Sequence, residues 1–99
     1  MFFAISCIDY KGKEDLRLAT RAQHMDYIAA SGAMVKAAGP YLAENGETMI
    51  GTLVILDCKD RGAAEAWLRQ DPYVKAGLFE RVDILPWRWS FGLPAGLSK

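Results

Sequence analysis

The sequence predicts one α+β domain, in which a single antiparallel sheet carries both main helices on one face. The 99 residues are enough for one hydrophobic core but leave no room for two. Apolar residues make up 52% of the chain and charged residues 24%, a composition typical of globular domains rather than disordered ones. The apolar pattern changes along the chain between strand-like alternation and helical spacing, in the order strand, helix, strand, strand, helix, strand.

The first strand is expected over residues 2–9, a short β-prone run. A helix is expected from Glu14 to about Ser31, because apolar residues recur there at helical spacing, with Gly32 as its C-cap. The expected apolar stripe of this helix consists of Leu18, Ala22, Met25 and Ala29. A neighbouring stripe consists of Arg17, Arg21, His24 and Ile28.

A β-hairpin is expected next, since extended runs over residues 33–42 and 48–58 flank Glu44-Asn45-Gly46-Glu47. An Asn-Gly pair between such runs favours a tight turn. A second helix is expected over residues 61–70, with Asp60 as its cap. Its predicted inner face consists of Ala63, Ala66, Trp67 and Gln70.

Asp71 and Pro72 predict a short further turn that ends near Gly77, because aspartate can cap a helix and proline is tolerated at its first position. The last strand is expected over residues 79–89, and residues 92–99 are expected to be a loose tail. The whole of 1–99 is then one domain. The resulting order, βαββαβ, is the split βαβ pattern of the ferredoxin-like fold.

Both faces of this sheet are predicted to need burial, because the first strand is apolar on both sides. Phe2 and Ala4 alternate along that strand with Phe3 and Ile5. Two helices cover only one face, and an open apolar face of this size usually marks an interface. We therefore expect a homodimer that packs sheet against sheet and leaves a cavity at or beside the junction.

The charges balance, with 12 basic and 12 acidic residues, so neither a nucleic acid nor a membrane partner is expected. The apolar start lacks a basic region and meets Asp9 and Lys11 too soon for a signal peptide, and no later run is long enough to span a membrane. Cys7 and Cys58 stand far apart in apolar runs without CxxC spacing. Reduced thiols in a cytoplasmic protein are expected, with a disulfide as the alternative.

Several motifs that would indicate other chemistry are missing from the sequence. It has no GxGxxG, P-loop or GxSxG motif, and no pair of histidines that could hold zinc. Nucleotide, phosphoryl and metal chemistry are therefore disfavoured, and no cofactor is expected.

Four short segments share their residue pattern with one family. They are Arg21-Ala22-Gln23-His24-Met25-Asp26-Tyr27-Ile28, Gly39-Pro40, Gly51, and Asp71-Pro72-Tyr73 followed by Ala76-Gly77-Leu78. Together they resemble the YCII-related (YciI-like) family over nearly the whole chain, as far as Trp87-Arg88-Trp89. The resemblance implies a dimeric α+β barrel and a His-Asp active site that maps onto His24 and Asp71. Dehydrochlorinase-like chemistry on halogenated rings is the activity usually attached to the family, but the resemblance does not identify a substrate.

His24 is the one histidine of the chain and its candidate general acid or base, since imidazole exchanges protons near neutrality. A carboxylate on one ring nitrogen would fix the tautomer and leave the other nitrogen to take or give a proton. The alternatives are a structural histidine and an Asp71 that only caps a helix. A carboxylate has two oxygens, so Asp71 can fill both roles.

Arg17 and Arg21 lie seven and three residues before His24, so on a helix all three share a broad face. They are candidates for binding an anionic substrate, with solvated surface arginines as the alternative. Tyr41 and Tyr73 are candidates for offering a hydroxyl to the same pocket.

Two classes of function remain from the sequence. The first is a cofactor-free enzyme of lyase, dehydrochlorinase-like or isomerase type, in which His24 acts as general base or acid and Asp71 orients it. The second is a noncatalytic metabolite-binding or accessory module that uses the same dimer pocket. A cofactor-independent oxygenase rests on fold analogy alone. Distances between the side chains must separate these classes.

Overall fold

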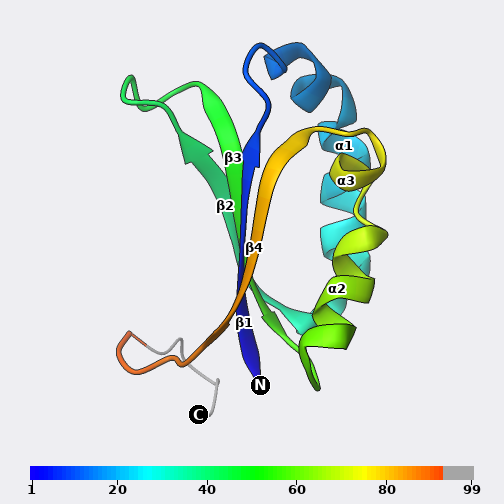
Figure 1. The fold of residues 1–99 in the computed structure, drawn as a ribbon, viewed down its shortest axis with the longest axis vertical. Coiled ribbons are helices and arrows are strands. Elements are labelled where there is room, and N and C mark those ends of the chain that lie inside the picture. The colour runs from blue at the N-terminus through cyan, green and yellow to red at the C-terminus, as the bar shows by residue number, and fades with distance from the viewer. Residues whose placement is uncertain (93–99) are drawn as a thin grey trace.

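One antiparallel sheet with the strand order β2-β3-β1-β4 carries all the helices on one face (Figure 1). The structure is a computed structural model that describes residues 1–92. The elements are β1 (Phe2–Asp9), α1 (Glu14–Ala30), the 3₁₀ turn η1 (Gly32–Met34), β2 (Val35–Leu42), β3 (Met49–Asp57), α2 (Arg61–Arg69), α3 (Pro72–Lys75) and β4 (Phe79–Trp87). This order confirms the predicted ferredoxin-like α+β fold. The expected tail, apart from residue 92, lies outside the described residues, and no helix among those described is long and apolar enough to cross a membrane.

The helices α2 and α3 start at the capping residues that the sequence indicates. The Asp60 side chain accepts a hydrogen bond of 2.9 Å from the backbone N–H of Ala63 at the start of α2. Asp71 accepts one of 3.0 Å from the N–H of Tyr73, with Pro72 at the first position of α3. Gly32 has a positive φ of 58°, the conformation in which glycine commonly follows a helix end.

The core lies between the sheet and α2. Alternate residues of β1 and β3, including Ile5 and Leu56, point into it and are fully buried. From α2 it receives Ala64, Trp67 and Leu68, while Ala66 and Gln70 of the predicted inner face are exposed. The predicted face was therefore displaced around the helix, because burying the leucine side chain stabilises the fold by about 1.5–3 kcal/mol and burying a glutamine does not.

The predicted apolar stripe of α1 is wrong. Leu18 and Met25 are 59% and 46% exposed, whereas the buried side chains of this helix are Arg17, Thr20 and His24. Burial of charged groups is costly unless they are paired and hydrogen-bonded. Arg17 and His24 each meet a buried carboxylate, and these pairings offset the cost and decide which side of α1 faces the sheet.

The far end of α1 is joined to α2 by a separate polar contact. The Tyr27 hydroxyl donates a hydrogen bond of 2.6 Å to the carbonyl oxygen of Trp67, and the Trp67 indole N–H donates one of 2.8 Å to Ser31 Oγ. The buried indole thus has a partner for its only polar group. Together with the sheet, these bonds fix the two helices side by side.

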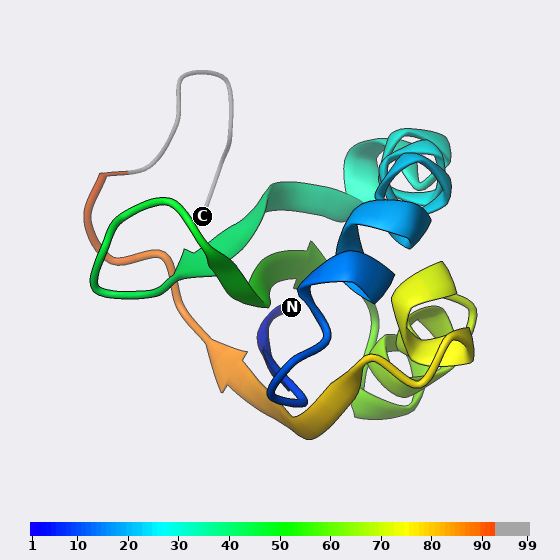
Figure 2. The ribbon, with the colours of Figure 1, turned by 90° about the horizontal axis from the view of Figure 1, so that it is seen from above.

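No helix of residues 1–92 lies over the other face of the sheet (Figure 2). Apolar side chains are exposed there, with Ile8, Leu85 and Trp87 at 37%, 57% and 40%. The alternation along β1 places Ile8 on the other face of the sheet from the buried Cys7, as the sequence predicts. The dimer expected from this open face stays a proposal.

The structure predicts an unreactive Cys7. Both cysteines are free, and burial, reinforced by the negative charges of Asp71 and Asp9, raises the pKa of the Cys7 thiol to about 12. At pH 8 the thiolate fraction is then on the order of one in ten thousand. In a Cys58→Ser variant, an aromatic disulfide reagent should not label Cys7 of the native protein within the time that free glutathione needs to react fully. The same reagent should label Cys7 after the protein is unfolded in urea. Rapid labelling of the native variant would contradict this burial.

Candidate active site

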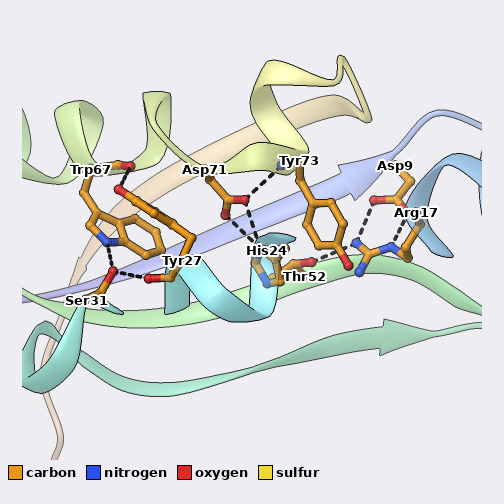
Figure 3. A network of polar contacts seen from close by, with 9 residues as sticks. All are labelled: Asp9, Arg17, His24, Tyr27, Ser31, Thr52, Trp67, Asp71 and Tyr73. Atoms are coloured by element: carbon orange, nitrogen blue, oxygen red, sulfur yellow. Dashed lines mark hydrogen bonds and ion pairs between the residues drawn. The ribbon is translucent and has the colours of Figure 1, made fainter. Parts of the chain in front are cut away.

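His24 of α1 and Asp71 at the start of α3 lie in direct contact (Figure 3). His24 Nδ1 is 2.9 Å from Asp71 Oδ1 and 3.1 Å from Oδ2, and both side chains are buried. An ionised carboxylate only accepts hydrogen bonds, so the network assigns the hydrogen to Nδ1. In the neutral ring, Nε2 then carries the free lone pair.

The same carboxylate caps α3, because Asp71 Oδ1 also accepts the hydrogen bond from the Tyr73 N–H. The cap and the histidine contact, which the sequence allows to occur together, are both present. The Asp71 backbone N–H in turn donates to the Leu68 carbonyl at 3.0 Å, so the residue is held at both its backbone and its side chain. The carboxylate is therefore oriented before any ligand binds.

The second ring nitrogen, His24 Nε2, reaches the surface of the protein, and the residue borders a cavity. This nitrogen has no hydrogen-bond partner among residues 1–92, and no fully buried side-chain nitrogen or oxygen of these residues lacks a partner, so Nε2 has to reach open surface. His24 lines a cavity of about 320 Å³ between α1 and the β2 side of the sheet. The other walls are Arg17, Arg21, Met25, Ile28, residues 35–40, Met49, Thr52 and Tyr73.

The Tyr73 ring lies between the His24 ring and the Arg17 guanidinium (Figure 3). The centres of the tyrosine and histidine rings are 4.0 Å apart with 17° between their planes, and Arg17 Cζ is 4.6 Å from the tyrosine ring centre. Stacking and cation–π attraction both favour this order. Both faces of Tyr73 are occupied, so the ring forms a rigid part of the cavity wall.

Arg17 is paired inside the protein. Its Nε and Nη2 donate to the two Asp9 carboxylate oxygens at 2.7 and 2.9 Å, and Nη2 donates to Thr52 Oγ1 at 2.8 Å. Burial lowers the pKa of Arg17, but the hydrogen bond and charge of Asp9 outweigh it and raise that pKa above its ordinary value. Arg17 is thus neither a solvated arginine nor a free cation, because Asp9 neutralises it.

Of the other two candidate residues, Arg21 and Tyr41, only one lines the cavity. Arg21 lines the cavity with an exposed side chain. Tyr41 does not line it, because its hydroxyl bonds to Ser6 Oγ at 2.9 Å on the open face of the sheet. No group of three or more histidine, cysteine, aspartate or glutamate side chains among residues 1–92 is arranged to hold a metal ion.

Two polar residues of the cavity, Lys36 and Thr52, were not predicted from the sequence. Thr52 could have been found from the sequence, because it alternates with Val54 and Leu56 on the side of an apolar strand that faces the helices. Lys36 had none, because it lies at an irregularity of β2, between the residues that pair with Leu56 and Ile55. Such a bulge changes the direction of side chains in a way that simple alternation does not predict.

The fold and the site together define a class: small ferredoxin-like proteins with a buried histidine–aspartate contact on a small-molecule-sized cavity. The chain belongs to the YCII-related family, because residues 1–88 match the model of the YCII-related domain. An uncharacterized protein of Haemophilus influenzae is 32% identical over 98 residues, covering 92% of this chain and 100% of that protein. Protein YciI of Escherichia coli is 29% identical over 99 residues, with the same coverage.

A solved structure is also similar over most of both chains. It is the 5-chloro-2-hydroxyhydroquinone dehydrochlorinase TftG of Burkholderia phenoliruptrix in complex with 2,5-dihydroxybenzoquinone. The TM-score is 0.81 at 25% identity, and the match covers 89% of this chain and 94% of that one.

Because Arg17 and Asp9 form a buried pair, we expect substitutions of the two residues to have non-additive effects on the free energy of unfolding. Arg17→Met leaves the Asp9 carboxylate buried without its partner and should lower the free energy of unfolding by about 3–5 kcal/mol. Asp9→Asn should also destabilise, whereas the double variant should lose clearly less than the sum of the two. Urea denaturation of all four proteins measures this coupling. Additive losses would show that the pair does not interact as the distances indicate.

Proposed function

We propose that this protein is a cofactor-free enzyme in which His24 Nε2 moves a proton on a small ring-shaped substrate. The observation that carries the proposal is the division of the imidazole: Nδ1 is held by Asp71, while Nε2 has no partner among residues 1–92 and His24 lines the cavity. A carboxylate in this position keeps the ring in one tautomer and stabilises the imidazolium that forms when Nε2 takes a proton. General base catalysis needs this combination of orientation and access.

The cavity supports a substrate of about one six-membered ring. Its volume of about 320 Å³ lies at the small end of the range for ligand pockets. The faces of Tyr73 are taken by His24 and Arg17, so a substrate would meet its edge and hydroxyl rather than stack on it. Burial raises the pKa of the Tyr73 hydroxyl, against the opposing charges of Arg17 and Arg21. The hydroxyl therefore stays protonated near neutrality and can donate a hydrogen bond to a substrate oxygen.

The likeness to TftG supports elimination of hydrogen chloride, or a related proton shift, as the reaction class. In the elimination, Nε2 takes a proton from the substrate, the electron pair moves into the ring system, the carbon–chlorine bond breaks and chloride leaves. The step needs no oxidant or reductant, because only a proton and a chloride ion are lost. An isomerase would use the same base and return the proton to another atom.

Chloride release from chlorinated hydroxyhydroquinones tests the enzyme proposal. His24→Gln should lower kcat by about 10²–10⁴-fold, because the general base is lost. Asp71→Asn keeps the size and capping ability but removes the charge, so we expect a smaller loss. Arg69→Gln, on the exposed side of α2 and outside the cavity, is the matched control and should behave as wild type. If turnover survives in His24→Gln, His24 is not the general base. If the wild type binds the ring compounds without turning them over, a noncatalytic binding module is favoured.

A homodimer built through the open sheet face is part of the same proposal, as is a cytoplasmic location. The exposed Ile8 and Leu85 support the dimer, since exposed apolar surface on a sheet is stabilised by burial. Light scattering at micromolar concentration should give twice the chain mass of 11.0 kDa. Leu85→Glu should shift the protein towards monomer, while Leu18→Glu, on the exposed stripe of α1, should not. A single-chain mass for the wild type would disprove the dimer.

A further inference from the structure

The described residues that line the cavity include three cations and no carboxylate. The cations are Arg17, Arg21 and Lys36. Asp9 neutralises Arg17, but Arg21 and Lys36 form no hydrogen bond or ion pair with any of residues 1–92. Asp71, the other buried carboxylate at the site, is engaged by His24 and by the cap of α3. The cavity therefore carries two positive charges without a fixed counter-charge.

These two charges approach the cavity from different elements. Arg21 lies one helical turn before His24 on α1, so their side chains are neighbours on the helix surface. Lys36 is half-buried on β2, which supplies the opposite wall. The charge of Arg21 also acts on the Tyr73 hydroxyl, where it opposes the effect of burial on the pKa of that group. Arg21 is thus close enough to influence a ligand at the same wall.

We propose that Arg21 and Lys36 make this cavity selective for ligands that carry an anionic group, such as a carboxylate or an ionised ring hydroxyl. The two cations hold that group and leave the ring of the ligand against His24 Nε2. This inference rests on the proposed function and adds the charge of its substrate. The low-dielectric walls of a cavity focus the field of such charges and raise the local concentration of an oppositely charged ligand.

The same cations have a consequence for the proposed reaction. When His24 takes a proton, negative charge develops on the ring of the substrate. Positive groups that are already in place stabilise this charge without reorganising during the step. Arg21 and Lys36 would then favour the transition state as well as binding, so their loss should lower kcat in addition to raising KM.

A matched pair of ring probes tests the selectivity. We choose 2,5-dihydroxybenzoate and 2,5-dihydroxybenzamide, which have the same ring and nearly the same shape but differ by one negative charge. NMR titration of ¹⁵N-labelled protein at low salt should show shifts at cavity residues and a Kd at least about 10-fold lower for the benzoate. The double variant R21Q/K36Q should reduce this preference to less than about 2-fold.

The control variant K59Q/R69Q removes the same amount of charge from exposed positions outside the cavity. It should keep the wild-type preference, which separates the effect of local charge from that of net charge. Arg21 and Lys36 have no partners among residues 1–92, so the dispersion of the amide spectrum should be unchanged in R21Q/K36Q. The single variants R21Q and K36Q divide the preference between the two residues.

Three results would overturn the proposal: equal affinities of wild type for the two probes, no shifts at cavity residues with the benzoate, or a preference that survives in a well-folded R21Q/K36Q. His24→Gln distinguishes this inference from the enzyme proposal. If the His24→Gln protein keeps the anion preference, the selectivity is supported, whether or not wild type turns over a substrate. If turnover depends on His24 but wild type shows no anion preference, the enzyme proposal stands and only the selectivity proposal is rejected.

Discussion

The Asp71 carboxylate is the group on which the arrangement of the site depends. It caps α3, binds His24 Nδ1 and contributes to the raised pKa of Cys7. Because the cap fixes the position of the carboxylate and the carboxylate fixes the imidazole, the direction of Nε2 is determined by the fold itself. Tyr73 follows Asp71 by two residues and stacks on the same imidazole, so one short segment supplies both the orienting group and part of the cavity wall.

The orientation of α1 shows how the protein accommodates this site. Turning Leu18 and Met25 inwards would gain about 1.5–3 kcal/mol for each side chain. Instead, the helix buries Arg17 and His24 and leaves these apolar residues exposed. Buried pairs contribute little net stability compared with apolar packing, although breaking one is costly. A helix that gives up apolar burial in favour of paired polar groups is typical of a functional site rather than of a structural core.

The cavity combines groups that are held with groups that are free. Arg17 and Asp71 are fully engaged within the protein, where they contact Tyr73 and His24. Arg21, Lys36 and Nε2 have no partner among the described residues. The division between held and unpartnered groups follows from the distances in this chain and not from the family match.

The sequence by itself determined the order of the elements, the caps at Asp60 and Asp71, and the pairing of the family-like His24 and Asp71 as candidates. These features depend on local spacing, on capping chemistry and on residue patterns that are shared within a family. The tertiary structure alone decided which face of α1 is buried, that Arg17 is neutralised by Asp9, that Tyr41 lies on the other face, and that Lys36 lines the cavity. Each of these depends on contacts between residues far apart in the chain or on the irregularity of β2, and neither periodicity nor spacing along one element reports them.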